Sequence, residues 1–136
     1  MNNYSVKTNK YGDKIYRLNR KTHREDGPAV EWASGYKEWY KNGLRHRKDG
    51  PAVEFIDGSK EWWLNGKLHR EDGPAIEHPN KTIYWYKNGS IHREDGPAVE
   101  SFNGDKSWFL DGIYYGFNNQ FTNKSWIKFV KTLIFS

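Results

Sequence analysis

Apolar and aromatic positions alternate with polar ones along this chain, in short stretches separated by turn residues. Residues 51–56 read Pro-Ala-Val-Glu-Phe-Ile and predict a strand that begins at proline, where no backbone N–H donor is needed. Asp57-Gly58 predicts a turn, and the aromatic stretch 60–64 predicts the return strand. Asn65-Gly66 is typical of a type I′ hairpin turn, and residues 68–70 predict a short further strand. The pattern therefore predicts a unit of strand, turn, strand and turn, without a helix.

This unit recurs in phase along the chain. The sequence His-Arg-x-Asp-Gly-Pro-Ala begins every 23 residues, without insertion or deletion, at His23, His46, His69 and His92. A tryptophan, called here the frame tryptophan, keeps the same spacing at Trp39, Trp62, Trp85 and Trp108. Units of this size cannot bury their own faces and are stabilised by stacking on their neighbours. We therefore predict a mainly β fold, a single-layer, elongated antiparallel sheet of 23-residue β-hairpin repeats.

The repeat frame divides the chain into three parts. Residues 1–22 keep the frame in degraded form and predict a degenerate first repeat or N-terminal cap, and residues 23–116 form the repeat array. Residues 117–136 predict a linker and a C-terminal capping helix, because apolar side chains recur at helical spacing over residues 124–135, with lysines on the other side. This amphipathic helix either covers an edge or face of the sheet or lies on an anionic membrane surface.

Aromatic residues explain how so polar a chain can build a core. The mean hydropathy is −1.04, yet the chain holds 7 Trp, 9 Tyr and 7 Phe. Each return strand carries two bulky residues in succession, such as Trp62 and Trp63, whose side chains point to opposite faces of a strand. We therefore expect an aromatic ladder on each face of the sheet.

The net charge of +5 is concentrated at the two ends of the chain, so it is weak evidence for nucleic-acid binding. The chain contains no cysteine, which excludes disulfides and thiolate sites. The residues after Met1 form no apolar run, and no stretch of about 18 apolar residues predicts a membrane span. We therefore expect a cytoplasmic protein.

The second repeat resembles the MORN repeat between Asp57 and His69, where Asp-Gly-Ser-Lys is followed by an aromatic strand and by Asn-Gly-x-x-His. The resemblance covers about residues 11–116 and departs at one place, because His-Arg-x-Asp-Gly-Pro-Ala replaces the usual His-Gly-x-Gly. This variant is similar to the divergent MORN-like repeats of bacterial, bacteriophage and large-virus proteins, including YwqK-family antitoxins. The resemblance implies hairpins stacked in a curved sheet, and a scaffolding, protein-binding or phosphoinositide-binding role rather than a reaction.

The recurrent His-Arg pairs are the first candidates for a binding surface. Arginine binds phosphate or carboxylate through two parallel hydrogen bonds, and aromatic neighbours can stack on a ligand ring. The alternative is structural, with each arginine paired to the aspartate two residues on or placed over a frame tryptophan. Asp-Gly-Pro likewise predicts a local turn in which glycine supplies an unusual φ. The predicted binding residues are Arg24, Arg47, Trp63, Arg70, Tyr86, Arg93 and Phe109.

These features predict a non-enzymatic protein-binding module without cofactor or metal. One histidine and one aspartate per repeat do not gather metal ligands, and symmetric repeats do not form the unique residue group of an active site. A phage or bacterial inhibitor or antitoxin that engages a host or defence protein is the narrower form of this prediction. The alternative is sequestration of a phosphorylated small molecule, such as a nucleotide signal, or of an anionic lipid headgroup. Homo-oligomers formed by pairing of sheet edges between copies are a further alternative.

Departures from the repeat cluster in the third unit. There His78-Pro79, Lys81 and Ile83-Tyr84 replace the residues that the frame carries elsewhere. They mark either a distinct contact surface or drift in an exposed hairpin.

Overall fold

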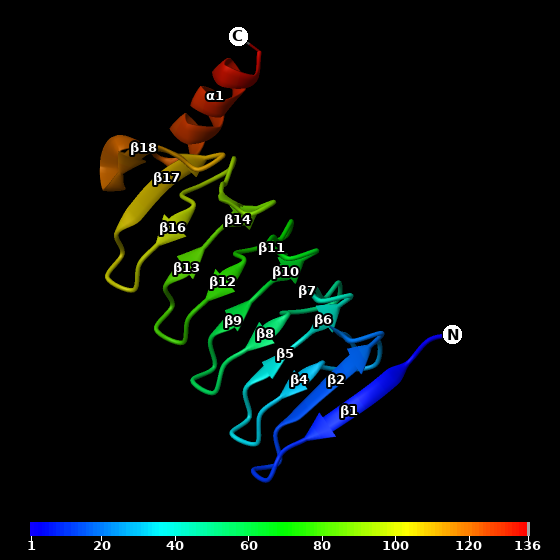
Figure 1. Ribbon diagram of the computed structural model, residues 1–136. Coiled ribbons are helices and arrows are strands. Elements are labelled where there is room, and N and C mark those ends of the chain that lie inside the picture. The colour runs from blue at the N-terminus through cyan, green and yellow to red at the C-terminus, as the bar shows by residue number, and fades with distance from the viewer. Residues whose placement is uncertain (136) are drawn as a thin grey trace. The chain divides into compact units, whose positions relative to one another are not determined.

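Short antiparallel hairpins make up most of the protein. The computed structural model describes residues 1–135, which divide into two compact units, the first from Met1 to Leu68 and the second from His69 onward. One helix follows the hairpins near the C-terminus (Figure 1). The prediction of a mainly β fold of antiparallel hairpins with a C-terminal helix is therefore confirmed.

The first unit contains the strands β1 to β11. Six of them follow the order β1-β2-β4-β5-β8-β9, β3 also pairs with β2, and β6-β7 and β10-β11 form separate two-stranded sheets. Each repeat thus contributes one hairpin to the longer sheet and folds a second hairpin of its own. The bounds are β1 Tyr4–Thr8, β2 Lys14–Leu18, β3 Lys21–Thr22, β4 Val30–Glu31, β5 Lys37–Glu38, β6 Tyr40–Lys41, β7 Leu44–Arg45, β8 Val53–Glu54, β9 Lys60–Glu61, β10 Trp63–Leu64 and β11 Lys67–Leu68.

The second unit repeats this plan and ends in a helix. Its longer sheet has the order β12-β13-β16-β17-β18, and β14-β15 is the separate hairpin. The bounds are β12 Ile76–Glu77, β13 Ile83–Tyr84, β14 Tyr86–Lys87, β15 Ser90–Ile91, β16 Val99–Glu100, β17 Lys106–Leu110, β18 Ile113–Phe117, a 3-10 turn Asn118–Gln120 and α1 Asn123–Ile134. Within residues 1–135, no helix combines the length and the apolar character needed to cross a membrane.

The return strand predicted over residues 60–64 is not continuous. β9 ends at Glu61 and β10 begins at Trp63, so the chain leaves the longer sheet at the frame tryptophan Trp62. In the last repeat the strand β17 continues through this position, but its pairing register shifts directly after the frame tryptophan. The simple alternation assumed for an aromatic ladder on each face therefore does not hold here.

Backbone hydrogen bonds explain the break. The N–H of Trp39 donates to the carbonyl of Ala52 in the following repeat, at 2.7 Å, whereas the carbonyl of Tyr40 accepts from the N–H of Arg24 in the preceding loop, at 3.2 Å. Because neighbouring residues bond to different partners, the strand cannot continue along one neighbour. The same change of partner recurs at Trp85.

The predicted type I′ turns are confirmed. Asn42 and Gly43 have φ values of 49° and 81°, both in the left-handed region that this turn requires. The other pairs have φ values within a few degrees of these, at Asn65-Gly66, Asn88-Gly89 and Asp111-Gly112. The second hairpin of each repeat is therefore fixed by its local sequence.

Lys81 occupies a turn position that glycine fills in the other repeats. Its φ is 75°, a conformation in which a side chain costs about 1 kcal/mol. We expect Lys81→Gly to raise the free energy of unfolding by about 0.5 kcal/mol, since relief of strain exceeds the added entropy of the unfolded chain. Chemical denaturation followed by circular dichroism measures the change. Lys37→Gly, within strand β5, is the control and should destabilise the protein; a destabilising Lys81→Gly would contradict this account.

A buried cluster joins α1 to the second unit's sheet. It consists of Trp126 and Val130 from α1 with Trp108 and Leu110 from β17, and is bordered by Tyr115, Phe121 and Phe129. The side chain of Trp126 is fully buried, and its indole Nε1–H donates to the carbonyl oxygen of Arg93 at 2.9 Å. Trp126 and Val130 of the apolar face are therefore covered by the sheet, which favours the capping role, whereas Leu133 and Ile134 near the helix end are 40% and 61% exposed.

The helix starts where the sequence supplies a cap. The Thr122 hydroxyl accepts the backbone N–H of Ser125 at 3.1 Å, and the Ser125 hydroxyl accepts the N–H of Thr122 at 2.9 Å. These reciprocal bonds satisfy donors that the first turn of a helix leaves without partners. They place the start of α1 one residue before the predicted start at 124.

Candidate functional site

The arginine of each His-Arg pair is held by its own loop, and Arg24, Arg47 and Arg93 also lie over an aromatic ring. Arg47 Nε donates to Asp49 Oδ1 at 3.2 Å, and Nη1 donates to the Pro51 carbonyl oxygen at 3.0 Å. Its guanidinium carbon lies 3.9 Å from the ring centroid of Trp39. The two loop contacts recur at Arg24, Arg70 and Arg93, and the ring contact recurs where Arg24 lies over Tyr16 and Arg93 over Trp85. The aspartate and aromatic contacts expected of arginines with a structural role are therefore formed. Ligand binding by these arginines stays a prediction.

A glycine lies three residues after each of these arginines, and the prediction that it supplies an unusual φ is wrong. None of the four has a positive φ, so unusual backbone conformation is not the reason for glycine. A Cβ atom would instead lie 3.1 Å from the guanidinium carbon at Gly27 and Gly50, 2.8 Å at Gly73 and 2.7 Å at Gly96. Glycine therefore leaves room for the arginine side chain, which a Cβ would displace, most at Gly73 and Gly96.

Each histidine of the repeat links one loop to the next turn. His46 Nδ1 accepts the backbone N–H of Asn65 at 3.0 Å, and the equivalent bonds are His23 to Asn42, His69 to Asn88 and His92 to Asp111, at 2.9 to 3.0 Å. Because Nδ1 is an acceptor, the neutral ring carries its proton on Nε2. In the other three repeats a glutamate lies 2.8 to 3.4 Å from Nε2, at Glu25, Glu71 and Glu94. Lys48 stands at this position beside His46.

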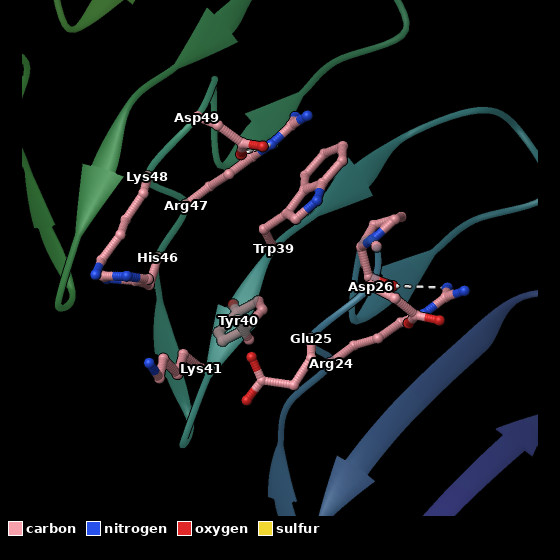
Figure 2. A pocket seen from close by; sticks show the side chains of 12 residues that line it. Arg24, Glu25, Asp26, Trp39, Tyr40, Lys41, His46, Arg47, Lys48 and Asp49 are labelled. Carbon is pink, nitrogen blue, oxygen red and sulfur yellow. Dashed lines mark hydrogen bonds and ion pairs between the residues drawn. The ribbon is translucent and has the colours of Figure 1, made fainter.

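Two grooves lie between successive His-Arg loops, one in each unit. The first groove has a volume of about 840 Å³ and is lined by the loops at Arg24 and His46 and by the strand residues Trp39, Tyr40 and Lys41. Figure 2 shows Trp39 and Tyr40 between the two loops, with Lys41, His46 and Lys48 on the same side of the groove. The second groove, of about 230 Å³, has the equivalent lining in the second unit. The first groove is therefore the larger and differs in charge at position 48.

Electrostatics set His46 apart from a solvent-exposed histidine. Partial burial, followed by repulsion from Lys41 and Lys48, lowers the pKa of His46 below its ordinary value of 6.5, and a smaller contribution from the Asn65 side chain opposes this shift. The neutral ring is therefore favoured in the folded protein. Unfolding removes both the burial and the fixed lysines, so the unfolded chain takes up a proton at higher pH.

We expect the free energy of unfolding to fall as the pH is lowered through 6.5, the ordinary pKa of histidine. In this range the unfolded chain binds a proton at His46, whereas the folded protein, with its lower pKa, does not yet do so. NMR titration of the His46 ring should give a pKa below 6.5. Lys48→Glu should raise that pKa, since it replaces a repelling cation with the carboxylate that the other repeats carry. An unchanged pKa in this variant would show that Lys48 does not act on His46.

The grooves bring some of the predicted binding residues together and leave others apart. Arg24 and Arg47 line the first groove, and Arg70, Tyr86 and Arg93 line the second. Trp63 and Phe109 line neither groove. The Trp63 indole donates to Glu61 at 2.8 Å beneath the guanidinium of Arg45, and Phe109 packs on Tyr114.

Sequence reasoning missed Lys41, His46 and Lys48 as a group, although it recognised the histidine as part of the repeat. The available signal was the single departure at position 48, where the repeat otherwise carries glutamate. Nothing in the sequence places Lys41, seven residues before Lys48, in the same groove. The second hairpin, β6-β7, does so.

A second surface lies at the tips of the first hairpins in the first unit. Trp32 is 52% exposed, Phe55 37% and Ile56 71%, although they follow the strands β4 and β8 directly. Tyr36 connects them, because its ring centroid lies 6.4 Å from that of Trp32 and 5.4 Å from that of Phe55. Burial and a hydrogen bond with Glu38 raise the pKa of Tyr36 well above its usual range. We call Trp32, Tyr36, Phe55 and Ile56 the tip patch.

Comparison with known proteins gives no family for this chain. No protein-family model matches the sequence, and no curated protein is similar to it. The resemblance to MORN repeats therefore rests on the residues between Asp57 and His69 and their equivalents. The two candidate surfaces, the first groove and the tip patch, have to be judged from their own geometry.

Proposed function

We propose that the chain is a non-enzymatic protein-binding module and that its partner packs on the tip patch. The observation that carries this proposal is the exposure of Trp32, Phe55 and Ile56 on neighbouring hairpins. Large apolar side chains gathered on a surface are typical of protein interfaces, where tryptophan and tyrosine supply much of the binding energy. An inhibitor that acts on a host or defence protein in the cytoplasm is the narrower form, and the resemblance to MORN-like repeats is its support.

The tip patch is held in place by its own turns, which favours binding without a large loss of entropy. Trp32 N–H donates to the Tyr36 carbonyl oxygen, and Phe55 N–H donates to the Ser59 carbonyl oxygen, both at 2.9 Å. Gly35 lies beside the neighbouring tip, since a Cβ at this position would be in ordinary van der Waals contact with Ile56 Cγ2, at 3.8 Å. Rigid aromatic anchors lose little conformational freedom when a partner covers them.

The proposal also draws support from the recurrent polar residues, which are engaged in building the repeats. The arginines hold the loops and the histidines hold the next turns, as the contacts of Arg47 and His46 illustrate. In the tip patch, Tyr36 packs between the tips, but Trp32 and Ile56 stay more than half exposed. The exposed area of the tip patch is therefore available for a partner.

The test is partner capture with matched surface variants. Affinity purification from native cells, followed by quantitative mass spectrometry, should recover a protein that the double variant Trp32→Ala/Ile56→Ser no longer retains. Exposed residues contribute little to folding, so this variant should unfold within about 0.5 kcal/mol of wild type. Phe102→Ala is the control, because Phe102 is 70% exposed and occupies the position equivalent to Ile56 in the second unit. Equal capture by the wild type and the double variant would refute the tip patch as the interface.

A further inference from the structure

The first groove carries positive charge that the neighbouring carboxylates leave uncompensated. Arg24 is paired with Asp26 at 2.8 Å and Arg47 with Asp49 at 3.2 Å. Glu25, the remaining acid of the lining, lies 2.8 Å from the neutral ring of His23 and keeps its charge, so the lining holds four basic and three acidic side chains. Lys41 and Lys48 also line the groove, and neither has an ion-pair partner within residues 1–135.

His46 adds an open hydrogen-bond donor between these lysines. Its Nδ1 is occupied by the Asn65 N–H, so the neutral ring presents Nε2–H. Within the described part of the chain, Nε2 of His46 has no hydrogen-bond partner, whereas Nε2 of His23 and of His69 each lies 2.8 Å from a glutamate oxygen. Lys41, His46 and Lys48 thus offer two ammonium groups and one N–H on the same side of the groove (Figure 2).

The second groove provides an internal comparison. Its lining keeps the lysine and histidine as Lys87 and His92, but Glu94 stands where the first groove has Lys48. A carboxylate at that position repels an incoming anion, and it lies 3.4 Å from Nε2 of His92. The local charge thus differs by two units between the grooves at this one position. Of these two grooves, only the first has the charge pattern of an anion site.

We infer that the first groove binds an acidic segment of the partner protein, with carboxylate groups held by Lys41, Lys48 and His46. This inference rests on the proposed protein-binding function. The volume of about 840 Å³ is large for a single anion, and the walls Trp39 and Tyr40 can contact a peptide between its charged groups. Sites for small organic ligands are mostly apolar, whereas this lining is mainly charged. Such charged contacts steer the encounter and select the partner.

The test is an NMR titration of the full chain with a hexaglutamate peptide at low ionic strength. We expect shifts of the His46 ring and Trp39 indole signals, and an affinity that weakens with added salt. Lys48→Glu should weaken the affinity by about tenfold or more, since it reverses one of two direct charge contacts. Lys7→Glu makes the same change of net charge in the exposed strand β1 and should leave the affinity within about twofold.

A gain of binding is the sharper part of the test. Glu94→Lys gives the second groove the charge pattern of the first and should create a second peptide site, seen as shifts of the His92 and Trp85 signals. Equal losses in Lys48→Glu and Lys7→Glu would overturn the inference, because binding would then follow net charge alone. Tighter binding of inorganic phosphate than of the peptide, or binding only to phosphatidylserine vesicles, would also overturn it.

The two proposals can fail separately. If the captured partner is lost from Trp32→Ala/Ile56→Ser but retained by Lys48→Glu, the tip patch stands and the groove does not contribute. If hexaglutamate binds at the groove while the tip-patch variant captures its partner normally, the groove inference stands and the proposed interface is wrong.

Discussion

Replacing Trp126 with alanine is expected to lower the free energy of unfolding of the second unit by about 4 kcal/mol. The ring is fully buried between Trp108 and Phe121, with centroid distances of 5.4 and 4.9 Å. Truncation leaves a cavity at the contact between α1 and β17. It also removes the indole donor of the Arg93 carbonyl oxygen. Urea denaturation followed by circular dichroism measures the loss.

Two control variants separate the contributions of Trp126. Trp126→Phe keeps most of the ring but removes the Nε1–H, so it should cost about 1 to 2 kcal/mol. Phe135→Ala removes an aromatic side chain that is 85% exposed just beyond the same helix, and it should be almost neutral. A Trp126→Ala variant as stable as wild type would show that α1 does not depend on this cluster.

Replacing Arg47 with methionine should lower the free energy of unfolding by about 2 kcal/mol. Methionine keeps much of the side-chain length but removes the charge above Trp39 and the donor to the Pro51 carbonyl oxygen. The ion pair with Asp49 contributes little to this figure, because the aspartate side chain is 88% exposed. The same denaturation measurement applies.

Lysine and asparagine variants test which contact of Arg47 matters. Arg47→Lys should be more stable than Arg47→Met by less than half of the difference between Arg47→Met and wild type. An ammonium group lacks the planar guanidinium, which stacks on a ring and donates hydrogen bonds from its edge. Asp49→Asn should change stability by less than about 0.5 kcal/mol. A loss in Asp49→Asn as large as the loss in Arg47→Met would place the stabilisation in the ion pair instead.

The features that the sequence predicted well are those encoded within a few residues. Asn-Gly pairs prefer left-handed φ values, so Asn42-Gly43 and its equivalents identify their hairpin turns without reference to the rest of the chain. Helical spacing of apolar residues likewise located α1 to within one residue at each end. Because the repeats recur at a strict interval of 23 residues, the turns and strands predicted for one repeat could be assigned to the others.

The features that it predicted poorly depend on neighbouring repeats in space. The strand break at Trp39 follows from a change of hydrogen-bond partner between repeats, which local alternation does not reveal. The glycine requirement at Gly96 comes from an arginine side chain folded back over it rather than from backbone conformation. Lys41 and Lys48 share one groove only because the hairpin between them folds back. None of these relations can be derived from residue type alone.

The hydrogen bonds that the histidine rings accept from the turns limit which changes in chain length the fold tolerates. Each joins a histidine to a turn residue 19 positions later, as between His23 and Asn42 or His69 and Asn88. An insertion or deletion within the strands of that interval shifts the turn relative to its acceptor and leaves a backbone N–H without this partner. Duplication or loss of a complete 23-residue repeat preserves every such bond. Outside the hairpin tips, changes in length that keep these bonds are therefore additions or losses of whole repeats.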